Sequence, residues 1–146
     1  AIIGILAAVG TVAYTGYTAS AKKSSAKSNH ASAVKYIAAE DQKCNAQGGT
    51  AMGGVLTCED RTGGEIITAA VTALNDFKNP FSTSNAAVRE TGASSTATGD
   101  KGYVNLVAAG NTITVTTCFD DSTDDDTANA CSVDADRVSN AIEVAE

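Results

Sequence analysis

The sequence has no tryptophan, one histidine and one proline, and aromatic residues make up only 5% of it. Aromatic side chains bury large areas, so a core built without them is modest and usually needs a covalent staple. A zinc site needs clustered cysteine or histidine ligands. The single histidine and the lack of a Cys-x-x-Cys pair argue against such a site.

Four cysteines are available as staples: Cys44, Cys58, Cys118 and Cys131. Four cysteines allow three pairings. We favour Cys44–Cys58 and Cys118–Cys131, because each pair closes a short polar or glycine-rich loop. Structural disulfides indicate an oxidising, extracytoplasmic location.

The motifs of common enzyme classes are also missing. The chain has no glycine-rich phosphate loop, no Gly-x-Ser-x-Gly and no plausible Cys/His dyad. Its carboxylates lie in acidic segments, where unperturbed surface charge is expected. We therefore expect a protein that is not an enzyme and has no cofactor.

The charge of the chain is −7, which argues against nucleic-acid binding through a basic surface. It is also unevenly spread. Residues 1–58 carry five lysines against two carboxylates, a net +3, whereas residues 119–146 carry nine carboxylates against one arginine, a net −8. This asymmetry either steers association between copies or makes a solvated acidic face, and both interpretations stay open.

The stretch that organises the chain is residues 1–47, which no proline interrupts. Residues 1–9 are apolar on every side, and residues 20–47 are amphipathic. A helix with these two characters needs two environments. We expect residues 1–19 to lie in a filament core or a membrane, and residues 20–47 to pack on a globular domain. The apolar run alone is shorter than the ~20 residues of a membrane span.

A continuous helix over residues 1–47 would be roughly 70 Å long. Gly10 and Gly16 weaken it by ~1 kcal/mol each relative to alanine, so the segment between them is where the helix could stretch or unwind. Tyr14 and Tyr17 share one face and either pack at the neck of the domain or contact a stacked subunit. His30 is expected to have a packing or hydrogen-bonding role. The packing face recurs at three- and four-residue spacing and consists of Ala26, His30, Ala33, Val34, Ile37 and Ala38.

Residues 48–146 are predicted to form the globular domain. Gly48 and Gly49 end the long helix, and residues 45–64 are predicted to form an irregular loop clipped by the first disulfide. Residues 65–78 have the apolar stripe of a second helix, which Asn79 and Pro80 end. Residues 82–100 are rich in serine, threonine, alanine and glycine, and we expect an exposed loop.

The clearest β signal comes later in the chain. Residues 103–109 and 112–119 flank Gly110 and Asn111, a two-residue connection suited to a tight hairpin. Residues 120–126 form an acidic loop. Residues 138–145 fit either a final strand or a helix. The predicted fold is α+β, with a long N-terminal helix packed on a small antiparallel sheet.

The stretch Ala-Ile-Ile-Gly-Ile-Leu-Ala-Ala-Val at residues 1–9, followed by Tyr14, resembles the N-terminal helix of type IV pilins and pseudopilins. The late cysteines, Cys118 and Cys131, resemble the pair that bounds the D-region of many pilins. The first residues of the family's mature helix, which include an N-methylated aromatic and an assembly glutamate, have no counterpart here. The family's helix-kinking proline falls at Val12, where Gly10 and Gly16 would have to replace its effect.

The resemblance implies a pilin-like fold and the major structural subunit of a type IV pilus. Such a subunit is staged in the inner membrane with its assembly machinery and then polymerises into an extracellular helical filament of identical copies. Adhesion, motility, DNA uptake and electron transfer all stay open as the role of the fibre. The residues expected in the assembly core are Ile2, Ile3, Ile5, Leu6, Val9 and Val12.

Two alternatives remain. One is a pseudopilin of a type II secretion system with calcium in a C-terminal loop, since clustered carboxylates offer the hard oxygen ligands that calcium prefers. The other is a monomeric, membrane-tethered secreted binding module, with residues 82–100 and the acidic loop as ligand surfaces. The calcium candidates are Asp120, Asp121, Asp124, Asp125 and Asp126.

Overall fold

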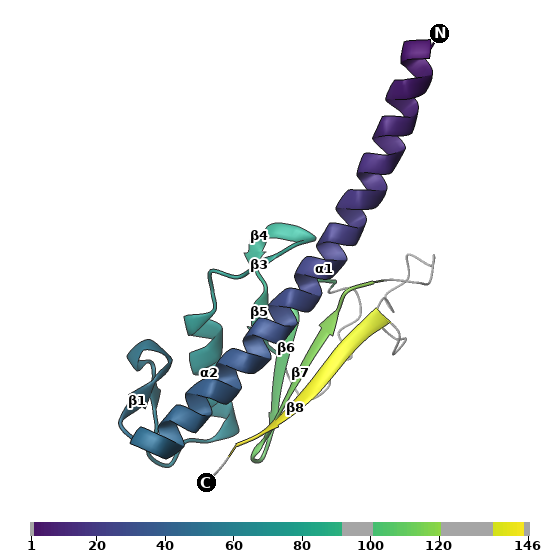
Figure 1. Ribbon diagram of the computed structural model, residues 1–146. Helices are drawn as coiled ribbons and strands as arrows, with labels where there is room; N and C mark the ends of the chain where they lie inside the picture. The colour runs from purple at the N-terminus through teal and green to yellow at the C-terminus, as the bar shows by residue number, and fades with distance from the viewer. Residues whose placement is uncertain (1, 92–100, 121–135, 145–146) are drawn as a thin grey trace.

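A long helix lies across a small α+β domain and extends well beyond it (Figure 1). The computed structural model describes residues 2–91, 101–120 and 136–144, and it describes side chains from residue 16 onward within these ranges. The chain is α+β, as predicted, with small sheets beside the N-terminal helix that are antiparallel except for one parallel pair of strands in the main sheet.

Helix α1 runs from Ile2–Gln47, 46 residues without a break, so it is continuous across Gly10 and Gly16. It ends where the sequence predicts. Gly48 and Gly49 have φ angles of +64° and +75°, a left-handed conformation that glycine adopts without steric cost. The N–H of Gly48 donates to the carbonyl of Cys44 at 2.9 Å and so closes the last turn.

The predicted irregular loop after α1 contains short regular elements. Strands β1, Thr50–Ala51, and β2, Leu56–Thr57, pair antiparallel around the 3₁₀ turn η1, Met52–Gly54. The predicted disulfide between Cys44 and Cys58 is present, with a Cα–Cα distance of 5.1 Å, and joins the end of α1 to the residue after β2.

Helix α2 spans Gly63–Ala73, so both predicted ends, 65 and 78, are wrong. It starts earlier because Thr62 caps it: the Thr62 hydroxyl accepts from the Glu65 N–H, and the Glu65 carboxylate accepts from the Thr62 N–H at 2.8 Å. Hydrogen bonds to its carboxylate lower the pKa of Glu65; the one from the Thr62 backbone N–H has the larger effect, and the one from the Thr62 hydroxyl adds to it. The helix stops at Leu74, so Phe77 lies beyond it.

Four strands form the main sheet, in the order β5-β6-β7-β8. They are β5, Val88–Glu90; β6, Val104–Ala109; β7, Thr112–Cys118; and β8, Arg137–Glu143. The β6–β7 hairpin turns at Gly110 and Asn111 as predicted, and the C-terminal stretch resolves as a strand rather than a helix.

The prediction of an exposed loop over residues 82–100 is wrong for its first half. Strand β4, Ser82–Ala86, pairs antiparallel with β3, Lys78–Asn79, and β5 pairs in parallel with β6. Val88 is buried while the side chains of residues 83–85 are exposed. The polar composition of strand β4 is typical of a loop, and for this reason the sequence predicted a loop here. Residues 92–100 lie outside the described part of the chain.

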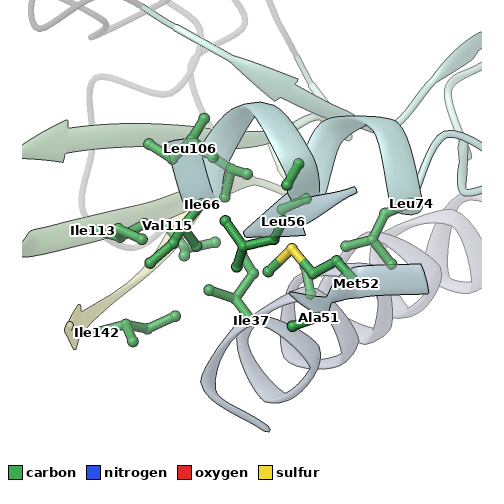
Figure 2. Packing of buried hydrophobic residues seen from close by; sticks show 14 of the residues in the cluster. Ile37, Ala51, Met52, Leu56, Ile66, Leu74, Leu106, Ile113, Val115 and Ile142 are labelled. Atoms are coloured by element: carbon green, nitrogen blue, oxygen red, sulfur yellow. The ribbon is translucent and has the colours of Figure 1, made fainter. Parts of the chain in front are cut away.

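The core lies between α1, α2 and one face of the main sheet (Figure 2). Ile37 of α1 is fully buried against Leu56 and Ile66. On β7, Ile113 and Val115 are buried and the intervening threonines are partly exposed, which is the alternation that a half-buried strand requires.

Candidate functional site

Among the side chains of helix α1 that the structure describes, those that pack on the domain lie toward its C-terminal end. No residue from Gly16 to Ser25 is buried, and burial begins at Ala26. Figure 1 shows the N-terminal part of the helix projecting beyond every labelled strand. The buried positions repeat at three- and four-residue intervals and therefore lie on one face: Ala26, His30, Ala33, Ile37, Asp41 and Cys44.

The neck between the two halves is open. Tyr17 is 75% exposed, so the expectation that it packs against the domain is wrong for the single chain. The side chain of Tyr14 is not among those the structure describes. Tyr17 is therefore an exposed aromatic side chain on the part of the helix before its first buried described residue, Ala26.

Polar contacts fix the upper part of the docked half. The ammonium of Lys23 lies 2.6 Å from the Asp120 carboxylate, and the Asn29 side-chain amide donates to the Lys78 carbonyl at 3.1 Å. Both contacts join α1 to segments far away in the sequence. They hold the helix just below the point where it leaves the domain.

His30 forms the central polar contact between α1 and the sheet. Its Nε2 lies 2.7 Å from Asn140 Oδ1, and because this amide oxygen can only accept, Nε2 carries the ring proton and donates it. The other ring nitrogen, Nδ1, lies 3.0 Å from the Thr117 hydroxyl oxygen and accepts a hydrogen bond from that hydroxyl. Burial lowers the pKa of His30, and the Asn140 hydrogen bond opposes this in part. The expected packing and hydrogen-bonding role is therefore confirmed.

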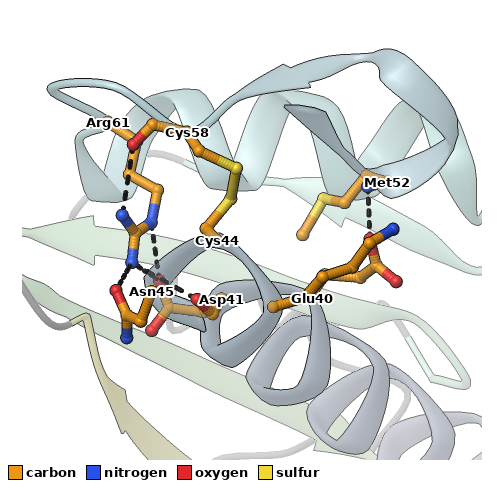
Figure 3. Close-up of a disulfide and its surroundings, with 8 residues drawn as sticks. Glu40, Asp41, Cys44, Asn45, Met52, Cys58 and Arg61 are labelled. Atoms are coloured by element: carbon orange, nitrogen blue, oxygen red, sulfur yellow. Dashed lines mark hydrogen bonds and ion pairs between the residues drawn. A yellow bond between two sulfur atoms is a disulfide. The ribbon is translucent and has the colours of Figure 1, made fainter. Parts of the chain in front are cut away.

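A disulfide and a buried ion pair fix the lower end of α1 (Figure 3). Arg61 Nε donates to Asp41 Oδ1 at 2.8 Å, Arg61 Nη1 donates to the Cys58 carbonyl at 3.2 Å, and both charged side chains are almost fully buried. Arg61 also donates to the side chain of Asn45. Next to Asp41 in the sequence, Glu40 accepts with its carboxylate from the backbone N–H of Met52. The sequence analysis did not identify Arg61, and no sequence motif distinguished it.

The predicted assembly residues all lie in the projecting part of α1, within backbone that is helical. Their side chains are outside what the structure describes, so their role stays a prediction. The same holds for Gly10. At Gly16 the structure leaves open space around the Cβ position, with no atom within 4 Å. The assembly residues are Ile2, Ile3, Ile5, Leu6, Val9 and Val12.

Only the first of the calcium candidates is described. Asp120 is ion-paired with Lys23, and within the described residues no three His, Cys, Asp or Glu side chains converge on a metal-sized site. Asp121, Asp124, Asp125 and Asp126 lie outside those residues. Cys118 is disulfide-bonded, and its expected partner, Cys131, also lies outside them.

A groove runs between α1 and the sheet on the side of β8. We call it the α1–β8 groove; its volume is about 520 Å3 and its lining residues are Lys27, His30, Ala31, Val34, Lys35, Phe119, Val138 and Asn140. Its polar floor groups, His30 and Asn140, bind each other, which leaves a mostly apolar wall. The sequence analysis missed it, although Phe119 and Val138 are apolar residues at strand ends.

Comparison with protein-family models, curated proteins and solved structures gives no match. Over the described part of the chain, no helical stretch combines the length and hydropathy that a bilayer span requires.

Proposed function

We propose that this chain is the structural subunit of a helical filament of the type IV pilus kind, with the N-terminal half of α1 as its core-forming stem. The observation that carries the proposal is the projection of α1 beyond its own domain. Residues 2–25 would extend about 35 Å past the first buried position at ~1.5 Å per residue.

The composition of the stem supports association with like segments. Six large aliphatic residues lie between Ile2 and Val12, and the first charged residue is Lys22. An exposed helix with this composition is unfavourable in water. Burial of six such side chains against neighbouring stems contributes on the order of 10 kcal/mol per subunit.

The arrangement suits a filament because the two halves of α1 have separate tasks. The docked half holds the domain through Ile37, His30 and the Cys44–Cys58 disulfide. The stem is then free to pack against other copies, and the domains form an outer shell. A heterologous contact of this kind repeats without closing and generates a helical polymer.

A charged substitution in the stem tests the proposal. Leu6→Glu places a carboxylate where neighbouring stems meet and should abolish filaments, because a buried unpaired charge costs several kcal/mol. Ala39→Glu introduces the same charge at an exposed position on the docked half and should leave filaments intact. Electron microscopy of surface material from cells that produce each variant gives the readout. Normal filaments from Leu6→Glu would contradict the proposal.

A further inference from the structure

The α1–β8 groove combines an apolar wall with a cationic rim. Phe119, Val34 and Val138 line the wall. Lys27 lies over the Phe119 ring, 4.0 Å from its centroid, and Lys35 is exposed on the helix edge of the groove. Two lysines of α1 form ion pairs within the described residues: Lys23 and Lys43. No described carboxylate lies within ion-pair distance of Lys27 or Lys35. The two charged residues that the structure shows lining the groove, Lys27 and Lys35, are both positive.

A second surface has the opposite character. Val55, in the β1–β2 hairpin, is 50% exposed and is one of only two large hydrophobic residues that are exposed among the side chains described. Glu59 lines the same surface hollow as Val55, and Asp60 follows it; both are exposed. We call Val55, Glu59 and Asp60 the Val55 knob. It combines one exposed apolar side chain with two exposed carboxylates, and no ion pair holds either carboxylate within the described residues.

The groove and the knob lie on different sides of the molecule. Figure 1 shows the β1–β2 hairpin on one side of α1 and strand β8 on the other. The disulfide ties the hairpin to the end of α1, so it cannot swing round to β8 of the same copy. The Val55 knob of one copy therefore cannot bind in the α1–β8 groove of the same copy.

We propose that the α1–β8 groove binds the Val55 knob of a second copy of this chain, with Val55 against Phe119 and Val138, and with Lys35 facing Glu59. The chemistry is complementary on both counts, apolar to apolar and positive to negative. Because the two surfaces differ, the contact is heterologous and repeats from copy to copy. The inference rests on the proposed function for this repeat, but it is a contact between domains and involves no residue of the stem.

Photocrosslinking in the full chain tests which surface occupies the groove. Ala31 lines the groove and is exposed, so Ala31→p-benzoylphenylalanine places a reactive group there. Copies with natural and heavy nitrogen are mixed before assembly, so that crosslinks between copies are separated by mass from those within one copy. The expected product joins the groove to residues 50–61 of a copy with the other label. Ala39→p-benzoylphenylalanine, exposed on α1 but outside the groove, is the matched control and should not give this product.

Charge exchange tests the proposed pairing. Lys35→Glu and Glu59→Lys should each reduce the crosslink yield about tenfold, because each places like charges across the contact. Both residues are exposed and make no ion pair within the described part of the chain, so the fold should tolerate either change. The double variant restores opposite charges and should return the yield to within about twofold of the original. Lys22→Glu, on the same helix but outside the groove, should leave the yield unchanged.

The outcomes separate this contact from the filament proposal. Crosslinks between copies that map elsewhere than residues 50–61, or a double variant that does not recover, overturn the groove contact even where filaments form. The expected crosslink between copies in a preparation without filaments supports the contact and counts against the proposed function. Filaments that give no crosslink from the groove leave the proposed function standing and overturn the contact.

Discussion

Replacement of Ile37 by alanine should loosen α1 from its domain more than any exposed substitution. Ile37 is fully buried where α1 meets the β1–β2 hairpin and α2, and Figure 2 shows it beside Leu56, Met52 and Ile66. The removed carbons contribute ~0.8 kcal/mol each through burial, about 2.5 kcal/mol in all. Because neighbouring side chains close the cavity only in part, the expected loss in the free energy of unfolding is about 3–4 kcal/mol.

Thermal unfolding of the full chain in detergent micelles, followed by near-ultraviolet circular dichroism, measures this effect. Detergent keeps the apolar N-terminal residues soluble, and the near-ultraviolet signal reports the packing of tyrosines such as Tyr103 and Tyr36. A loss of 3–4 kcal/mol corresponds to a fall in Tm of about 10 °C for a chain of this size.

Val55→Ala is the matched control, since Val55 is aliphatic but half-exposed. It should change the free energy of unfolding by less than about 1 kcal/mol. If Ile37→Ala lowers Tm no more than Val55→Ala does, then α1 is not docked through the face described above. That result would also remove the structural basis for calling the N-terminal half a separate stem.

Three further predictions concern the contacts that hold α1. Cys44→Ala with Cys58→Ala should lower the free energy of unfolding by about 3 kcal/mol, because the disulfide spans a sequence separation of 14 and restricts the unfolded chain; denaturant titration measures it, and an unchanged midpoint contradicts it. Arg61→Ala should cost about 3–5 kcal/mol because it leaves the buried Asp41 carboxylate without its ion pair, and adding Asp41→Asn should recover part of this loss. Burial lowers the folded-state pKa of His30 below its ordinary value, so the unfolded chain binds the proton more tightly and stability should fall as pH decreases through about 6.5. His30→Gln should flatten that slope between about pH 7.5 and pH 5.5; an identical slope in this variant would show that His30 is not its source.

The elements that the sequence predicted well have strong local signals. Residues 112–116 alternate between threonine and aliphatic side chains, and Gly110 adopts φ +60° at the turn. Gly48 and Gly49 end α1 because both adopt left-handed conformations. The first disulfide was predicted because its cysteines flank a short glycine-rich segment. In each case, the signal that predicted the structure lies in residues close together in the sequence.

The wrong secondary-structure predictions arise where pairing with residues distant in the sequence determines the structure. Strand β5 is three residues long, and it is a strand because it pairs in parallel with β6, sixteen residues later at Val88 and Val104. Nothing in the polar run of β4 before it predicts that pairing. The start of α2 was a different error, since Thr62 and Glu65 form a capping box that the sequence does display at the required spacing.

The sequence predicted the helical stem, but it did not predict the polar contacts that hold α1 on the domain. The apolar character of residues 2–12 and the face that begins at Ala26 can both be read from the periodicity of the sequence. The pairing of Arg61 with Asp41, and of His30 with Asn140, depends on residues 20 and 110 positions apart being brought together by the fold. The α1–β8 groove depends on three separate segments for the same reason.

The distribution of these anchors along α1 bears directly on the filament proposal. A helix held at one point could pivot, and its stem would then point in a different direction in each copy. The contacts of α1 instead run from Lys23 to Cys44, which spans about 30 Å at ~1.5 Å per residue. Constraints at both ends of such a length fix the direction of the helix as well as its position. A regular polymer requires that every copy present its stem at the same angle, so the anchors near Lys23 should matter to filament order even though they contribute little to folding stability.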